Sequence, residues 1–192
     1  PGLTTPDDSY HGVTYAKEFG KAAYITKATA QLMRDFGSTP APISSWIMGM
    51  HLESLGVRME RHCTNAQKVA EWLAADPRVS WVSYPGLEND KYHALAEKYM
   101  PNGTCGVISF GVPGGREKVS AFLDHLKMVS IATHVADARS CTLYPAGTTH
   151  RQLTEEQLEE AGVGIDLVRL SCGIENTADI IADLDQALAA VQ

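Results

Sequence analysis

An arginine stands inside an apolar, strand-like run near the end of the chain. The run reads Asp166-Leu167-Val168-Arg169-Leu170-Ser171-Cys172-Gly173-Ile174-Glu175. A guanidinium drawn into a protein interior needs an anionic partner to offset its loss of water. Asp166 and Glu175 are candidates for that partner, and the carboxylate of a small ligand, gripped by two N–H groups, suits Arg169 equally well. The residues alone leave these alternatives open.

The composition is that of an ordinary folded protein and restricts the partners. The 192 residues, 44% hydrophobic and 20% charged, suffice for one domain or one and a half small ones. A net charge of −7 argues against nucleic acid or an anionic membrane as a main partner. No apolar run approaches the roughly 20 residues that span a bilayer, and no signal-peptide pattern is present, so a cytoplasmic location is expected. The four separated cysteines predict buried free thiols and no metal site.

The pattern of apolar residues predicts two helical segments followed by alternating strands and helices. The helical segments are 15–36 and 43–75. The second is long for a globular helix, so Gly49 or Gly56 is expected to bend or break it. Strands are predicted at 79–84, 106–112, 129–133, 141–144 and 167–171, and helices at 92–99, 117–125, 178–191 and after the capping box of Thr154. This order predicts an α/β unit with a mixed or largely antiparallel sheet and helices mainly on one face.

Six segments in register carry a resemblance to one enzyme family. They are Pro1-Gly2-Leu3 with Pro6-Asp7 and Ser9-Tyr10-His11-Gly12; Leu52-Glu53-Ser54-Leu55 with Arg58-Met59, Arg61-His62 and Asn65-Ala66; Val82 with Tyr84-Pro85-Gly86-Leu87; His134-Val135-Ala136-Asp137-Ala138-Arg139-Ser140; Tyr144-Pro145-Ala146-Gly147-Thr148-Thr149-His150; and Arg169-Leu170-Ser171 with Gly173-Ile174-Glu175. Together they resemble the Cys/Met-metabolism enzymes that depend on pyridoxal phosphate. The Thr-Thr-His and opening segments favour the O-acetylhomoserine sulfhydrylase branch over the cystathionine lyases.

The resemblance implies a type I, aspartate aminotransferase-like fold with a large cofactor domain and a smaller C-terminal α/β domain. On this basis residues 1–45 are the tail of the large domain, residues 46–75 are a linking helix, and residues 76–192 are the small domain. The chain opens on a turn-rich segment without an initiator Met. We therefore expect a fragment or a processed chain.

The resemblance also implies roles for particular residues. Arg169 would clamp the α-carboxylate of an amino-acid substrate, and His134 would help to hold it where sulfhydrylases usually have Asn. Ser140 is a further substrate-binding candidate, although a loop hydroxyl bonded to its own backbone is an equal alternative. Thr149 and His150 would lie near the site, or would simply form a turn.

The resemblance implies a cofactor that this chain is not expected to anchor. Pyridoxal phosphate needs a lysine for a Schiff base, a carboxylate at its ring nitrogen and a phosphate cup. The family carries that lysine in a Ser-x-Thr-Lys context, which none of the chain's eight lysines has. No catalytic residue is therefore expected within the chain, most cofactor contacts should lie outside it, and the chain alone should be inactive.

The implied reaction is γ-replacement, in which acetate leaves from Cγ of O-acetylhomoserine and sulfide or a thiol adds. The implied partners are this amino-acid substrate, an N-terminal cofactor domain and further copies of the chain in a homotetramer. Relatives with cystathionine γ-synthase, cystathionine γ-lyase or methionine γ-lyase activity are alternatives. A non-catalytic, isolated small domain is another.

Further polar residues have plainer interpretations. His62, His93 and His125 are expected to be structural residues at the surface or boundary of helices, not ligands. Arg58 and Arg61 are expected to form solvated or interface ion pairs with Glu53 or Glu60 of the same helical segment.

Overall fold

A computed structural model describes residues 2–191, so Pro1, which opens the first family-like segment, and Gln192 lie outside the described residues. The chain divides into two compact units between Glu53 and Ser54. The division falls within the segment 43–75, which the sequence predicts as a long helical segment bent or broken at Gly49 or Gly56.

The first unit is mainly helical, and helical elements fill residues 15–36 as predicted. Its elements are η1 (Asp8–Tyr10), α1 (Tyr15–Phe19), η2 (Gly20–Ala22), α2 (Ala23–Lys27), η3 (Ala28–Met33), α3 (Arg34–Phe36) and α4 (Pro42–Glu53). Tyr15 is fully buried and donates its hydroxyl to Oε1 of Gln31 over 2.9 Å. Lys27 donates to Asp7 over 2.7 Å. A few polar contacts therefore tie this small unit together.

The helix predicted at 43–75 is in fact two helices, α4 and α5 (Leu55–Ala75). Ser54 interrupts them with φ −98° and ψ 3°. The interruption lies beside Gly56, one of the two positions where the sequence predicts a break, whereas Gly49 lies inside α4. Glycine lowers helix propensity at both positions, and only the one near Ser54 coincides with the break.

The second unit contains a five-stranded mixed sheet. Its strands are β1 (Val82–Ser83), β2 (Val107–Gly111), β3 (Ser130–Ile131), β4 (Cys141–Leu143) and β5 (Leu167–Ser171), in the order β1-β2-β5-β4-β3. All neighbours are antiparallel except β3 and β4, which are parallel. The mixed α/β architecture of the prediction is confirmed.

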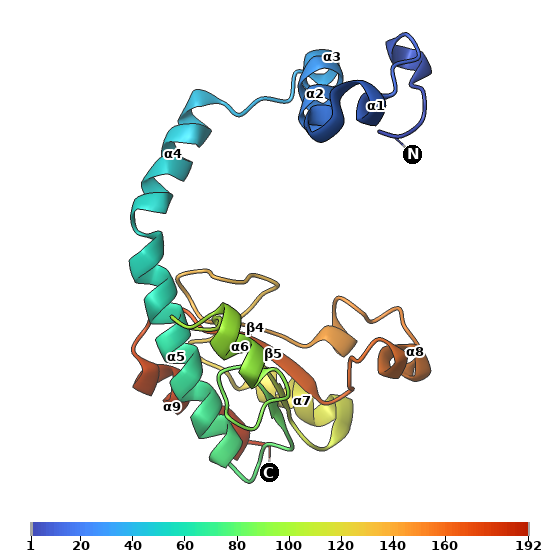
Figure 1. The fold of residues 1–192 in the computed structure, drawn as a ribbon. Helices are drawn as coiled ribbons and strands as arrows, with labels where there is room; N and C mark the ends of the chain where they lie inside the picture. The colour runs from blue at the N-terminus through green and yellow to red at the C-terminus, as the bar shows by residue number, and fades with distance from the viewer. Residues whose placement is uncertain (1, 192) are drawn as a thin grey trace. The chain divides into compact units, whose positions relative to one another are not determined.

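Helices cover one face of this sheet (Figure 1). The helices of the second unit are α5, α6 (His93–Tyr99), α7 (Gly115–Asp124), η4 (Pro145–Gly147), α8 (Glu155–Glu160) and α9 (Thr177–Ala189). Buried side chains of α5, α7 and α9 form one core with Ile108, Phe110, Val168 and Leu170 of the central strands. Because successive strand residues point to opposite faces, Ser109 and Arg169 lie on the other face.

No helix within residues 2–191 is both long and apolar enough to cross a membrane. In the same part of the chain, no group of three or more His, Cys, Asp or Glu side chains is placed to hold a metal ion. All four thiols are free, but only Cys141 and Cys172 are buried, so the prediction of buried thiols is wrong for the half-buried Cys63 and Cys105.

Candidate functional site

Strand β5 presents Arg169 on the open face of the sheet. Its neighbours Val168 and Leu170 are fully buried in the core, while Arg169 is half-buried. Across the sheet, Arg169 stands opposite Ser109 of β2 and Leu143 of β4. The apolar alternation of β5 thus fixes the side to which the guanidinium points.

The guanidinium of Arg169 has an unfilled hydrogen-bonding position. Its Nη2 donates to the carbonyl oxygen of Thr133 over 2.9 Å. Its Nε is buried and has no hydrogen-bond partner. A buried N–H without an acceptor is costly, and a carboxylate would supply that acceptor together with the opposite charge.

Neither carboxylate that the sequence offers to Arg169 binds it. Asp166 accepts from the indole Nε1 of Trp81 over 2.9 Å. Glu175 accepts from the backbone N–H and the hydroxyl of Ser140. Among residues 2–191, no ion pair involves Arg169. Of the alternatives open at the level of the sequence, an external carboxylate is therefore the one that the geometry favours.

Residues 133–140 form a loop that is fastened beside β5. The loop accepts the Arg169 bond at Thr133, and the N–H of Ala136 donates to the hydroxyl of Ser171 over 3.1 Å. Ala136 has φ 57°, in the left-handed region that favours glycine. The backbone at Ala136 therefore has a conformation that Gly would adopt without strain.

His134 follows directly after the residue whose carbonyl Arg169 binds, and its side chain is exposed. The structure therefore brings His134 and Arg169 together through Thr133. Near the other end of the loop, the backbone N–H and side chain of Arg139 lower the pKa of Asp137 below its usual value. His134 contributes a smaller electrostatic effect in the same direction.

Ser140 is fully buried, and its hydroxyl is already occupied on both sides. It donates to Oε2 of Glu175 over 2.9 Å and accepts from the N–H of Gly173 over 2.9 Å. A hydroxyl with one proton has none left to donate to a ligand. These bonds support a role in positioning the loop.

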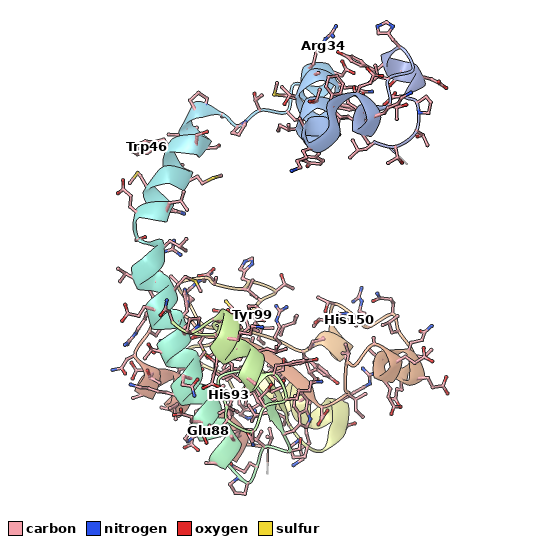
Figure 2. All side chains as sticks on the ribbon, in the orientation of Figure 1. Arg34, Trp46, Glu88, His93, Tyr99 and His150 are labelled. Carbon is pink, nitrogen blue, oxygen red and sulfur yellow. The ribbon has the colours of Figure 1, made fainter. Side chains whose placement is uncertain are left out.

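Thr149 and His150 lie on the segment between η4 and α8, where Figure 2 labels His150. The Oγ1 of Thr149 and the Nδ1 of His150 are 2.9 Å apart and share a hydrogen bond. The N–H of His150 donates to the carbonyl of Pro145 over 2.9 Å. Within residues 2–191, no hydrogen bond joins this pair to Arg169, so the contacts given are those of a turn.

Three side chains of α5 bind the backbone that follows β5. Their role is not among those predicted from the sequence. His62 Nδ1 contacts the carbonyl of Cys172 at 2.6 Å, and Asn65 donates to the carbonyls of Gly173 and Glu175, each over 2.9 Å. Arg61 donates to the carbonyl of Glu175 over 3.0 Å.

Two predictions on α5 are therefore wrong. His62 is 1% exposed, so it lies in the interior and not at the surface or boundary of the helix, although its contact with the Cys172 carbonyl agrees with the structural role expected for it. Arg61 binds backbone carbonyls of residues 174 and 175, not a glutamate of its own helix. The sequence signal that could have found His62 is its spacing from Asn65 and Val69, which places all three on the inward face of α5.

A separate groove of about 480 Å³ lies between α5, α6 and residues 100–104. Lys68, Tyr84 and His93 are among the residues that line it. Arg169, His134 and Ser140 do not, so the candidate site is an open surface of the sheet and not this groove.

The lysines of the chain do not fit a cofactor anchor. Such an amine must be enclosed beside the substrate and free to react. Lys27 is held by Asp7, and Lys118 donates to the carbonyl of Val191. The other six are exposed: Lys17, Lys21, Lys68, Lys91, Lys98 and Lys127. The residues present fit a ligand carboxylate and do not fit the anchoring of pyridoxal phosphate.

Comparison with known proteins identifies the family. The family model described as "Cys/Met metabolism PLP-dependent enzyme" matches residues 7–189, and the chain belongs to this family. The O-acetyl-L-homoserine sulfhydrylase of Leptospira meyeri is 44% identical over 97% of this chain, and O-acetyl-L-homoserine sulfhydrylase 1 of Thermus thermophilus is 40% identical over 98%. The chain spans 44% and 45% of the lengths of these two relatives.

A solved structure is similar over nearly the whole chain. It is that of a Campylobacter jejuni protein described as an O-acetylhomoserine (thiol)-lyase with N'-pyridoxyl-lysine-5'-monophosphate. The TM-score is 0.85 and the sequence identity is 38%, over 97% of this chain and 44% of that one. This likeness confirms the predicted aspartate aminotransferase-like type of fold.

Proposed function

We propose that this chain supplies the substrate-carboxylate site of an O-acetyl-L-homoserine sulfhydrylase. The observation that carries the proposal is the buried, unpartnered Nε of Arg169, on a guanidinium that no carboxylate of residues 2–191 engages. Relatives of this name that are 40–44% identical support the reaction. That reaction is the replacement of the acetyl ester of O-acetyl-L-homoserine by sulfide, which yields homocysteine and acetate.

In this proposal Arg169 binds the α-carboxylate and thereby orients the amino acid. His134, exposed beside Thr133, borders the same carboxylate. Ser140 holds the loop, while Thr149 and His150 lie at the edge of the site. Residues 1–45 belong to a cofactor domain, residues 46–75 link the two domains, and residues 76–192 are the small domain.

Pyridoxal phosphate would be held by protein outside this chain and would supply the electron-withdrawing chemistry of the reaction. Exposed apolar side chains support such a missing partner. On α4, each of six large apolar side chains is 44–61% exposed: Ile43, Trp46, Ile47, Met48, Met50 and Leu52. A helix that is apolar on all sides is normally buried in the complete protein. We propose that a cofactor domain and further copies of the chain, in a cytoplasmic homotetramer, cover it.

The test uses the complete gene product loaded with pyridoxal phosphate. Incubation with O-acetyl-L-homoserine and sulfide should release homocysteine and acetate, and Arg169→Ala should abolish this release. Arg151→Ala, which removes an exposed guanidinium, is the matched control. If the protein instead breaks down methionine or cystathionine without sulfide, it is a lyase and the proposed sulfhydrylase activity is wrong. The absence of all these reactions would leave a non-catalytic small domain.

A further inference from the structure

The carboxylate of Glu175 is directed at a single residue, Ser140, which lies 35 positions earlier in the chain. Its Oε1 accepts the backbone N–H of Ser140 over 2.6 Å, and its Oε2 accepts the hydroxyl over 2.9 Å. Hydrogen bonds to an ionised carboxylate are roughly twice as strong as those between neutral groups. This two-point contact fixes the end of the 133–140 loop.

Gly173 also binds the Ser140 hydroxyl that contacts Glu175. Its N–H donates to the same Ser140 hydroxyl over 2.9 Å. A Cβ at Gly173 would stand 2.3 Å from Oε2 of Glu175 and 2.5 Å from the carbonyl oxygen of Ala138. Only glycine fits there, so the backbone after β5, the Glu175 carboxylate and the loop are packed without spare room.

Helix α5 holds the other side of Glu175. Asn65 donates to the Glu175 carbonyl over 2.9 Å, and Arg61 donates to the same oxygen over 3.0 Å. Asn65 is itself oriented by the hydroxyl of Thr177, which donates to its Oδ1 over 2.6 Å. Glu175 is therefore anchored to a helix of the core, and the loop is anchored to Glu175.

The far end of the same loop meets Arg169. The carbonyl of Thr133 accepts from Nη2 of Arg169, which leaves Nε for another acceptor. The orientation of the guanidinium thus depends on where residues 133–140 lie. The carboxylate of Glu175 accepts its hydrogen bonds from Ser140 and does not bind the guanidinium of Arg169.

We propose that Glu175 is a positioning residue of the carboxylate site. It acts through Ser140 on residues 133–140, and through Thr133 on the orientation of Arg169 and the location of His134. The identity of the ligand, an amino-acid α-carboxylate, rests on the proposed function. The mechanical link between Glu175 and the loop stands on its own contacts.

The first arm of the test measures hydrogen–deuterium exchange in the loop without any ligand. In Glu175→Gln, amides of residues 133–140 should exchange about tenfold faster, because the hydroxyl of Ser140 loses its charged acceptor. Ser140→Ala should have a similar effect, and the double variant should be no worse than the more affected single variant. Glu160→Gln, an exposed glutamate of α8, is the control and should change nothing in the loop.

The second arm measures steady-state kinetics of the complete, cofactor-loaded protein with O-acetyl-L-homoserine. Glu175→Gln should raise KM about tenfold and change kcat by less than about threefold, because an interaction lost from substrate binding appears in KM. A merely structural defect would instead reduce the amount of active protein. Arg169→Lys should raise KM and should accelerate exchange in the loop less than Glu175→Gln does, because it removes only the bond at Thr133.

The outcomes separate the two claims. Unchanged loop exchange in both Glu175→Gln and Ser140→Ala would overturn the positioning role, even if Arg169→Lys still raised KM. An unchanged KM in Arg169→Lys would overturn the proposed function and leave the exchange result intact. If Glu175→Gln accelerates exchange in β2 and α9 as well, it has unfolded the chain, and the milder Ser140→Ala decides the question.

Discussion

Nη2 of Arg169 and the carbonyl oxygen of Thr133 are joined by a 2.9 Å hydrogen bond across 36 residues. This bond fixes the plane of the guanidinium while its buried Nε has no acceptor. The protein therefore orients the guanidinium of Arg169, and a ligand must supply the hydrogen-bond acceptor for its Nε. The relationship links a strand residue, which the core holds in place, to a loop that other contacts must hold.

Replacing Arg169 by lysine should weaken substrate binding strongly. A lysine keeps the charge but loses the planar fork and the bond to Thr133. Losing hydrogen bonds to a charged group costs about 2 kcal/mol, which corresponds to a rise in KM of about 30-fold. Steady-state kinetics of the complete protein measure it, and a KM equal to that of the unchanged protein would contradict the carboxylate role.

Replacing Ala136 by glycine should stabilise the loop. Ala136 has φ 57°, and an L-residue with a Cβ pays about 1 kcal/mol or more in that conformation. Glycine removes this strain but gains freedom in the unfolded chain, so the net gain in unfolding free energy should be about 0.5 kcal/mol. Ala138→Gly, at a neighbouring position with negative φ, is the control and should destabilise the protein. Urea unfolding distinguishes the two signs.

The sequence predicts well those elements whose own residues mark them, such as an apolar run or a capping box. The apolar run at 167–171 is β5 to the residue, and the Thr154 capping box forms with both of its hydrogen bonds. The strand predicted at 79–84 is reduced to β1, two residues at the edge of the sheet, where only one neighbouring strand is available for pairing. Edge strands have half the pairing of central ones, which a residue pattern cannot reveal.

The candidate site is less predictable, because its supports are distant in sequence. Arg169 stands out as a charge in an apolar strand, and its half-buried setting agrees with that signal. The contact of Asn65 with Glu175 joins residues 110 positions apart, and no short sequence pattern around either residue predicts it. Ser140 shows the same limit: the sequence leaves a ligand contact and a backbone bond open, and only the fold places Glu175 beside it.

Replacing Asp183 should unfold the second unit more easily. Its 6% exposed carboxylate accepts three consecutive backbone N–H groups of residues 127–129, over 2.8–2.9 Å. Asp183→Ala leaves these donors without an acceptor and should lower the unfolding free energy by about 3 kcal/mol or more. Asp183→Asn should cost less because one oxygen remains. Asp124→Ala, at an exposed position, should have little effect, and equal losses in both alanine variants would refute this role.

Asp7 should titrate in strong acid. The hydrogen bond from Lys27, followed by that from Ser9, lowers the pKa of Asp7 from 3.8 to about 2. A lowered pKa means that the carboxylate stabilises the first unit fully above its ordinary pKa, and that this contribution is lost as the pH falls from about 4 through 2. Lys27→Met should return the pKa of Asp7 towards 3.8. Carboxyl carbon NMR measures both, with the exposed Lys21→Met as the control.

Cys172 should resist thiol reagents that reach other cysteines. Burial, and secondarily the charge of Glu175, raises the pKa of Cys172 to about 12, so its thiol stays protonated at pH values near neutrality. Cys63 and Cys105 are only half-buried and are accessible to a reagent, although burial also raises the pKa of Cys63. Brief treatment of the folded chain with iodoacetamide should therefore modify the half-buried Cys63 and Cys105 before Cys172, which should stay intact, as peptide mass analysis can show. In urea all four thiols should react. Modification of Cys172 in the folded protein at the rate of Cys105 would mean that the core beneath β5 opens far more readily than its packing implies.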